Sequence, residues 1–367
     1  MTHQERFHAI MNYQPVDRMP VYYFGTWRET KERWRNEGLL DVAAAARSGG
    51  PQLPEMDPDW EDGMWDLYGL VNPNPISTAP AAILDETDTH RVIRTPLGAV
   101  HRESKSGSSI PAHLEEALAP TRESWERFCR FLDVDAPGRV GEEWDATIER
   151  LNESDRVIPF LAGSLFGWPR EWLGIEAWSY LAFDDPVLFE DIIATLTEHY
   201  ITLYRPVLEA VRFDFAYFFE DCCSSTGPLL SPPIYTKYYD KYYRRLIDFY
   251  HEMGVPLVLL DSDGKTDALI PLWMDSGVDI LFPIEVGTWQ TDPVVLRSRF
   301  GQDLRMMGGI DKHVIPRGES AIREHLEHRL ALVEEGGYIP IPDHRIPPDC
   351  SLDDFRKYLD IFSEYFA

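Results

Sequence analysis

The sequence predicts a (β/α)8 barrel, an α/β fold in which parallel strands alternate with helices. Its 367 residues exceed one small domain but suit a single barrel that carries insertions. Short apolar segments without polar alternation recur along the chain, as expected for strands buried on both faces, and helical patterns separate them. An open doubly wound sheet is the alternative, but no G-x-G-x-x-G motif follows the first apolar segment.

A helix is expected to open the chain. Thr2 and Glu5 have the spacing of a capping box, and Phe7 and Ile10 follow at a helical interval. Pro15 ends this pattern shortly before the first apolar segment.

Seven apolar segments are the expected strands of the barrel. They cover residues 19–24, 157–162, 213–219, 255–260, 280–284, 304–307 and 338–341. Helical patterns cover residues 186–211, 232–253, 266–276, 293–299 and 319–335. From residue 255 onward, strand and helix repeat at roughly 25 to 35 residues, which is the size of a βαβ unit. No segment stands out as the eighth strand.

Residues 38–120 depart from this alternation, and we expect them to form an insertion within a single domain of residues 1–367. Residues 91–94 and 99–102 flank Thr95-Pro-Leu-Gly98, a pattern that predicts a β-hairpin with a Pro-Gly turn. We expect the insertion to cap the mouth of the barrel. The alternative is a long segment that covers only its side.

The composition excludes several classes of protein. The chain has 62 acidic and 35 basic residues, and its net charge of −27 opposes binding to nucleic acid and to anionic lipid. No apolar run approaches the roughly 20 residues of a membrane span, and the N-terminus lacks the apolar core of a signal peptide. Four cysteines are too few for a disulfide framework, so we expect a cytoplasmic protein.

The positions that follow the predicted strands are unusually acidic. Barrel enzymes take their catalytic groups from these carboxyl ends. The polar residues there include Glu220, Asp261, Asp263, Glu285 and His344. Because crowded carboxylates repel one another, a bound metal or a cationic substrate would offset their charge. The alternative for each aspartate is a cap on the helix that follows it.

Five successive blocks of the chain carry a resemblance to a known family. The blocks are QERFHAIMNYQPVDRMPVYYFG, FFEDCCSSTGPLLSPPIYTKYY, LLDSDGKTDALIPLWMDSGVDILFPIE, GGIDKHVI and GGYIPIPDHRIPPD. Together they resemble the uroporphyrinogen decarboxylase superfamily, which contains the heme-pathway decarboxylase and corrinoid-dependent methyltransferases. The resemblance implies an enzyme with a barrel fold, whereas membership alone does not fix the reaction.

The decarboxylase branch of that superfamily grips substrate carboxylates with an RQAGR motif just after its first strand. The matching stretch here is Gly25-Thr-Trp-Arg28-Glu29, which keeps only Arg28. The resemblance therefore implies that uroporphyrinogen is not the substrate, and the chain looks closer to the methyltransferase branch.

The methyltransferase branch holds zinc through an H-x-C-G motif and a later cysteine. The matching positions are Asp261, Asp263 and His344, so the resemblance implies a metal site without cysteine. Two carboxylates and an imidazole suit Zn²⁺, Mn²⁺ or Fe²⁺, and a metal-free site stays open. Glu220 or Glu285 would add a ligand or hold the substrate.

Aromatic residues in the loops after the strands are candidates for substrate binding. Trp27, Trp168 and Trp289 are expected to line a pocket for an apolar body or a quaternary ammonium group. Packing within the core is the alternative for each of them. Arg28 and Glu285 complete the predicted substrate-binding set.

The resemblance thus implies a methyltransferase that moves a methyl group between a small O- or N-methylated compound and a corrinoid carried by a partner protein. His344, Glu220 and Asp261 are the predicted catalytic residues, with a divalent Zn, Mn or Fe ion as the possible cofactor. One alternative is a decarboxylase or lyase in which Arg28 binds the anion and His344 delivers the proton. The other alternative is a non-catalytic, ligand-binding barrel.

Overall fold

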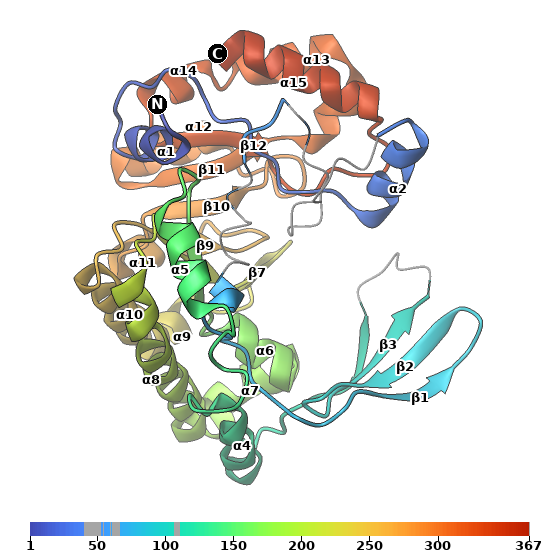
Figure 1. The fold of residues 1–367 in the computed structure, drawn as a ribbon, viewed down its shortest axis with the longest axis vertical. Coiled ribbons are helices and arrows are strands. Elements are labelled where there is room, and N and C mark those ends of the chain that lie inside the picture. The colour runs from blue at the N-terminus through green and yellow to red at the C-terminus, as the bar shows by residue number, and fades with distance from the viewer. Residues whose placement is uncertain (40–52, 54, 59, 61–66, 106–110, 367) are drawn as a thin grey trace.

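A six-stranded parallel sheet forms the centre of the molecule, in the order β12-β11-β10-β9-β6-β5 (Figure 1). The computed structural model describes residues 1–39, 53, 55–58, 60, 67–105 and 111–366. The strands are β5 (Pro159–Gly163), β6 (Phe215–Phe219), β9 (Val258–Asp261), β10 (Ile280–Ile284), β11 (Arg305–Ile310) and β12 (Tyr338–Pro342). The predicted α/β class with a parallel sheet is therefore confirmed, and six of the seven expected segments overlap its strands.

The remaining expected strand, residues 19–24, is extended but makes no regular ladder. Its continuation meets the segment that follows β12 through a parallel bridge between Thr26 and Ile346, where the Ile346 N–H donates to Gly25 at 3.0 Å. At the other end, the Met19 N–H donates to the Phe366 carbonyl at 2.9 Å, outside the sheet. Full closure into an eight-stranded barrel thus stays a prediction.

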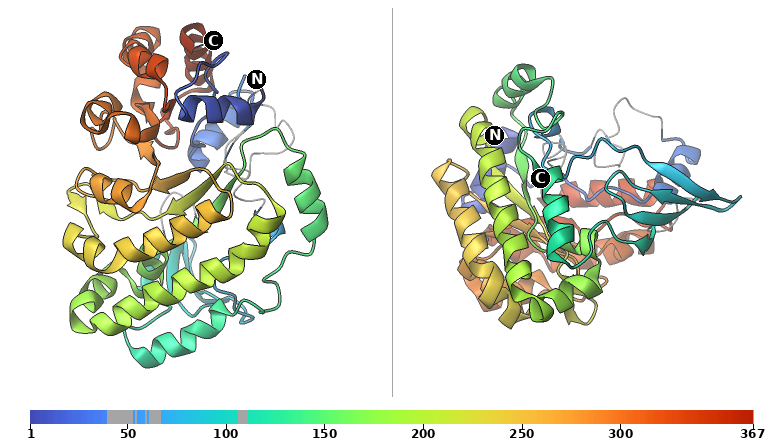
Figure 2. Two further views of the ribbon diagram at one scale, coloured as in Figure 1. Left: turned by 90° about the vertical axis from the view of Figure 1, so that its left-hand side faces the viewer. Right: turned by 90° about the horizontal axis from the view of Figure 1, so that it is seen from below.

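The helices lie outside the parallel sheet, and those from α6 onward follow its strands along the chain (Figure 2). They are α2 (Arg28–Asn36), α4 (Arg122–Cys129), α5 (Trp144–Asn152), α6 (Gly167–Leu173), α7 (Ile175–Asp184), α8 (Pro186–Ala210), α9 (Pro232–Ile234), α10 (Asp240–Glu252), α11 (Ile270–Ser276), α12 (Pro293–Phe300), α13 (Glu319–Glu327), α14 (Leu330–Glu335) and α15 (Leu352–Phe366). The single helix predicted over residues 319–335 is divided into α13 and α14, and Arg329 at the break is buried and donates to Gly309 at 3.0 Å. None of the described helices is long and apolar enough to cross a membrane.

The predicted opening helix is confirmed as α1 (His3–Met11). Its capping box is complete, because the Glu5 N–H donates to the Thr2 hydroxyl at 3.1 Å and the Thr2 N–H donates to the Glu5 carboxylate at 2.9 Å. His8 lies 2.6 Å from Asp214, which precedes β6. Helix α1 therefore lies at the amino ends of the strands, away from the predicted site.

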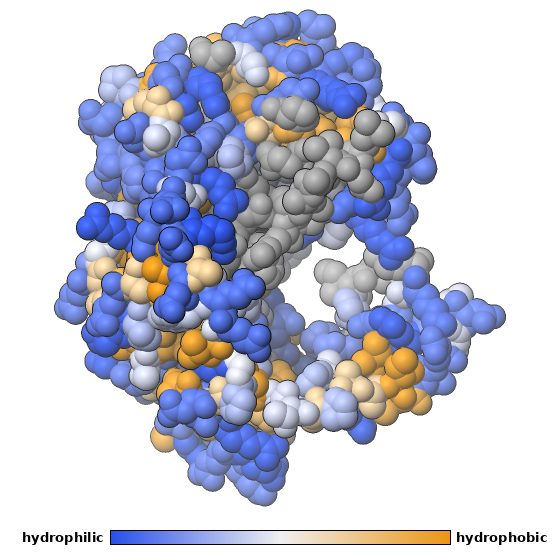
Figure 3. Space-filling view, viewed as in Figure 1, coloured by the Kyte–Doolittle hydropathy of each residue, from blue (hydrophilic) through white to orange (hydrophobic). Residues whose placement is uncertain are grey.

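A four-stranded antiparallel sheet projects from the body and is called the arm here, residues 82–115 (Figures 1 and 2). Its strands are β1 (Ala82–Glu86), β2 (His90–Arg94), β3 (Val100–Ser104) and β4 (Ala112–Glu115). The predicted hairpin is confirmed, since β2 pairs with β3 across the turn at residues 95–98. Figure 3 shows an opening between the arm and the body, so the arm extends outward instead of lying flat on one surface.

Both faces of the parallel sheet are buried, which explains why its strands show no polar alternation. Along β6, Ala216 and Phe218 pack in one apolar cluster, whereas Phe215 and Tyr217 pack in another. Because successive side chains point to opposite faces, the two clusters lie on the two sides of the sheet. The four cysteines are all free, as the sequence predicts.

Candidate active site at the carboxyl ends of the strands

Three polar side chains converge from the loops that follow β9, β10 and β12. Asp263, Glu285 and His344 each place one potential ligand atom within 4.8 Å of the others, and we call them the strand-end cluster. The His344 Nε2 atom lies 3.4 Å from the Asp263 Oδ2 atom. Glu285 is 5% exposed, and the Gly264 N–H donates to its Oε2 atom at 3.4 Å. The cluster therefore joins a buried carboxylate to two more accessible groups.

Asp263 also belongs to a second group, with Asp221 and Asp261. The Tyr217 hydroxyl donates to Asp261, which is buried at the end of β9. Of the three ligands predicted together, Asp263 and His344 thus converge with Glu285, while Asp261 lies with Asp221. This geometry therefore supports the predicted ligand role of Asp263 more directly than the predicted catalytic and ligand roles of Asp261.

The charge balance around Glu285 is set by burial and by its neighbours. Burial, and then the charge of Asp263, raise the pKa of Glu285 to about 7, while His344 and Lys312 act in the opposite direction. The Lys312 Nζ atom is 4.0 Å from the Glu285 Oε1 atom but only 3.1 Å from Asp343 Oδ1. Because Lys312 is held mainly by Asp343, Glu285 exchanges a proton near neutral pH when no cation is bound.

His344 is positioned by aromatic rings. Its ring centroid lies 5.1 Å from that of Phe24, edge-on, and 6.0 Å from that of Trp27, stacked. The preceding Asp343 is fully buried and accepts from the Gly287 N–H at 2.8 Å. Asp343 therefore ties together the loops that follow the strands, and packing holds the His344 ring.

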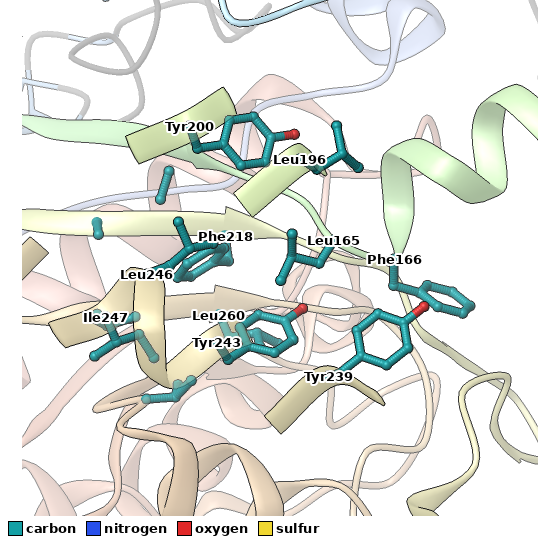
Figure 4. Close-up of a cluster of buried hydrophobic side chains, with 14 of the residues drawn as sticks. Leu165, Phe166, Leu196, Tyr200, Phe218, Tyr239, Tyr243, Leu246, Ile247 and Leu260 are labelled. Carbon is teal, nitrogen blue, oxygen red and sulfur yellow. The ribbon is translucent and has the colours of Figure 1, made fainter. Parts of the chain in front are cut away.

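Glu220 has a structural position, which does not support the catalytic role predicted for it. Its carboxylate is fully buried. It accepts hydrogen bonds from the backbone N–H groups of Leu165, Phe166 and Gly167 and from the hydroxyl groups of Ser164 and Tyr243. Figure 4 shows Tyr243 and Tyr239 side by side, near Leu165 and Phe166. Burial raises the pKa of Glu220, and its five donors fix the start of α6.

Arg28 and Trp27 begin α2 and point to different surroundings. The Arg28 side chain is 59% exposed, and its Nε atom lies 2.9 Å from the Glu32 carboxylate one turn along the helix. Trp27 is 42% exposed and stacks on His344. The structure therefore brings Trp27, and not the charge of Arg28, to the strand-end cluster.

The other two predicted tryptophans are half-buried near strand ends. Trp168 lies on α6, and its ring centroid is 6.1 Å from that of Phe219 at the end of β6. Trp289 lies in the loop after β10, and its indole nitrogen is buried without a hydrogen-bond partner in the described part of the chain. Substrate contact by either residue remains a prediction.

Lys312 also lies in this region, although it was not among the residues predicted from the sequence. It lies just after β11 in the block GGIDKHVI, at a position equivalent to those of the other strand-end residues. Its location after a barrel strand is the signal that identifies it in retrospect. Glu285 was predicted to contact substrate or to add a metal ligand, and it lies among the potential metal ligands.

The residues of the strand-end cluster fit a divalent cation. Two carboxylates and one imidazole form a donor set that suits Zn²⁺, Mn²⁺ or Fe²⁺. The second oxygen of Asp263, Oδ1, is buried and has no hydrogen-bond partner among the described residues. An unpaired buried carboxylate oxygen is unfavourable, and a cation would satisfy it. A cation would also offset the repulsion that raises the pKa of Glu285.

Comparisons with solved structures agree with this fold. A methyltransferase from Methanosarcina mazei matches with a TM-score of 0.55 and 14% identity, over 99% of this chain and 98% of that chain. A structure described as a vitamin-B12-independent methionine synthase from Listeria monocytogenes matches with a TM-score of 0.33 and 15% identity, over 59% of this chain and 66% of that chain. The second score is too low to support an argument, whereas the first match shows a shared fold along the full length.

Sequence comparisons identify the family. No curated protein matches the sequence. The family model described as uroporphyrinogen decarboxylase (URO-D) matches residues 163–365, which is more than half of the chain and includes β6 to β12 and the strand-end cluster. The chain belongs to the uroporphyrinogen decarboxylase family.

Proposed function

We propose that the protein is a methyltransferase that moves a methyl group between a small O- or N-methylated compound and a corrinoid carried by a separate protein. The observation that carries the proposal is the convergence of Asp263, Glu285 and His344 at the carboxyl ends of parallel strands. Sheets of this kind bind ligands at that edge. The fold shared with a methyltransferase from Methanosarcina mazei supports the proposal.

The strand-end cluster would hold a divalent metal through oxygens of Asp263 and Glu285 and a nitrogen of His344. Such an ion, when bound, would polarise an ether oxygen or an amine nitrogen that carries the methyl group, whereas a quaternary ammonium nitrogen has no free electron pair for the ion and is already activated by its own positive charge. The chain itself keeps the three donors in place. The Gly264 N–H fixes Glu285, and the rings of Phe24 and Trp27 fix His344.

The substrate would lie against the aromatic side chains beside the cluster. Trp27 presents an exposed indole next to His344, which suits an apolar body or a quaternary ammonium group. A reduced corrinoid would supply the electron pair that accepts the methyl group, so the bond between the methyl carbon and the heteroatom would break with its electron pair left on the heteroatom. The heteroatom keeps that pair, and a leaving oxygen then takes a proton from water.

Methyl transfer to free cob(I)alamin tests this function. The purified chain, loaded with Zn²⁺, Mn²⁺ or Fe²⁺ in separate samples, is mixed anaerobically with methyl ethers or quaternary amines, and the methylcobalamin formed is measured by absorbance. We expect methylcobalamin to form with at least one compound and one metal. His344→Ala is expected to lower the rate about a hundredfold, whereas His328→Ala on the exposed end of α13 leaves it unchanged.

Failure of every compound with every metal would contradict the proposal. Stoichiometric binding of a small ligand without turnover would instead favour the non-catalytic alternative. The decarboxylase alternative assigned the substrate carboxylate to Arg28, and the ion pair of Arg28 with Glu32 at the surface of α2 gives that assignment no support.

A further inference from the structure

Arg345 lies at the edge of the candidate site, and its backbone is fixed on both sides. It follows His344, whose ring is packed on Phe24. It precedes Ile346, which forms the parallel bridge to Thr26 and accepts from the Thr30 hydroxyl at 2.7 Å. The loop after β12 is therefore anchored to the first extended segment, and Arg345 is held where the two meet.

The guanidinium of Arg345 lies over aromatic rings that also form the surroundings of His344. Its Cζ atom is 5.9 Å from the ring centroid of Phe24 and 5.9 Å from that of Trp27. The same two rings contact His344. A cation, an imidazole and an exposed indole thus share one wall at the edge of the strand-end cluster.

The charge of Arg345 is not neutralised by an acidic side chain of the described residues, because no ion pair or hydrogen bond of its guanidinium occurs there. An arginine without an acidic partner is unusual in a chain that has 62 acidic residues. The nearby Arg28, by comparison, is paired with Glu32. Stacking on an aromatic face leaves the N–H donors of a guanidinium free for a planar anion. Arg345 is therefore available to a ligand.

We infer that Arg345 binds a carboxylate of the substrate, whose flat apolar body lies against Trp27 and whose methylated end points to the strand-end cluster. Only the position of the methylated end at the strand-end cluster rests on the proposed methyl transfer. In the cation-free protein Asp263 and Glu285 repel a carboxylate from the cluster, and a bound divalent cation would already be neutralised by these two side chains, so Arg345 is the cation beside the site whose charge is left for the substrate. A net charge of −27 disfavours a phosphate dianion more than a carboxylate, so a single guanidinium suits a monoanion.

Binding of matched aromatic methyl ethers tests the inference without requiring turnover. The probes are 4-methoxybenzoate, its neutral analogue 4-methoxybenzamide, and 4-methoxyphenyl phosphate as the dianion. Each is titrated into the full-length metal-loaded protein by calorimetry. We expect 4-methoxybenzoate to bind about ten- to a hundredfold more tightly than the amide, which is the range for a charge-assisted hydrogen-bonded pair.

Variants of Arg345 assign this preference to its charge. Arg345→Met is expected to remove the preference for the benzoate and to leave amide binding unchanged, while Arg345→Lys keeps part of it. Arg317→Met, at an exposed position after β11, is the matched control and is expected to bind all probes as the parent protein does.

Three results would overturn the inference: equal affinities for benzoate and amide, an unchanged preference in the folded Arg345→Met protein, or tighter binding of the phosphate. Failure of all three probes to bind would overturn it as well. If the benzoate binds through Arg345 but no methylcobalamin forms from it or from other ethers and amines, the carboxylate site stands and the proposed methyl transfer fails.

Discussion

Glu285 shows how the chemistry of this site depends on where one side chain lies. From the sequence, Asp261 was one of three predicted metal ligands, and Glu285 was a candidate for substrate binding or for an additional ligand. In the structure, Glu285 is the carboxylate that lies with Asp263 and His344. The sequence locates acidic residues after the strands but does not tell which way they point, because side chains alternate regularly only within a strand.

We predict that Glu285→Gln weakens binding of a divalent ion and reduces its dependence on pH. A ligand must lose its proton to bind metal, and the pKa of Glu285 in the cation-free protein is about 7. Metal affinity of the parent protein should therefore fall as the pH drops below 7, by up to about tenfold per pH unit for one competing proton. Calorimetric Zn²⁺ titrations between pH 6 and 8 measure this slope.

The control for this prediction is Glu324→Gln on the exposed surface of α13, which should leave both affinity and slope unchanged. An equal pH slope in the parent and Glu285→Gln proteins would show that another group competes with the metal.

A second prediction at this scale concerns His199, a histidine buried in α8. Burial, and then the charge of Arg139, lower the pKa of His199 from 6.5 to about 4. The unfolded chain therefore binds this proton before the folded protein does, so stability is present above pH 6.5 and is lost as the pH falls toward 4. Between pH 7 and pH 5 the loss from this residue amounts to about 2 kcal/mol.

Urea unfolding at the two pH values measures this effect. The parent protein is expected to lose about 2 kcal/mol more than His199→Gln, which cannot take up the proton. Equal losses in the two proteins would mean that His199 is not kept neutral in the folded state.

At the scale of elements, the apolar segments predicted the strands well because both faces of the sheet are buried. The segment over residues 19–24 is extended but forms no regular ladder. One of its partners is Phe366, at the other end of the chain, and local sequence patterns do not report such a contact. The sequence also did not reveal the backbone conformation of the loops that follow the strands. Asp221 has a φ of 46°, and Gly264 has a φ of 95° with the Cys223 backbone 2.8 Å from where a Cβ would lie. Such turns decide which side chains converge, and no periodicity reports them.

Helix α6 gives the prediction that belongs to this scale. Glu220→Ala leaves three backbone N–H groups and two hydroxyl groups at the start of α6 without their acceptor in a buried place. We expect the free energy of unfolding to fall by about 3 to 5 kcal/mol, because a buried donor left without its acceptor costs about 1 to 3 kcal/mol and several are left at once. Urea unfolding measures the change, and Glu324→Ala should stay within about 0.5 kcal/mol of the parent. A comparable, small effect in both variants would place Glu220 outside the support of α6.

At the scale of the whole molecule, the arm combines a predictable hairpin with an orientation that the sequence did not reveal. Figure 3 shows an apolar patch on the arm, and the exposed large apolar side chains of its strands are Ile83, Leu84 and Leu114. Its contacts with the body include His113, whose Nε2 atom lies 3.9 Å from the Glu171 carboxylate on α6. Sequence patterns within the hairpin report strand pairing, whereas the direction of the arm depends on such contacts with distant residues.

Neither apolar cluster of the body contains a described residue of the arm, Ala82–Glu115. We therefore predict that replacing residues 82–115 by a flexible linker of about six residues leaves the body folded. Such a linker reaches about 20 Å, whereas the outer strands of a four-stranded sheet lie about 14 Å apart. The urea transition should stay cooperative, its free energy should change by less than about 1 kcal/mol, and Zn²⁺ affinity at the strand-end cluster should be retained.

Removal of Leu352–Phe366, helix α15, is the contrasting deletion. Its buried residues Phe355 and Phe362 belong to a body cluster, so their loss should abolish the cooperative transition. If deletion of the arm has the same effect, residues 82–115 are part of the body's folding unit, and the interpretation of 38–120 as an insertion in one domain is wrong. If cooperativity and Zn²⁺ affinity both survive, the parallel sheet folds and the strand-end cluster binds metal without the arm. The arm is then an insertion whose role is separate from the stability of the body.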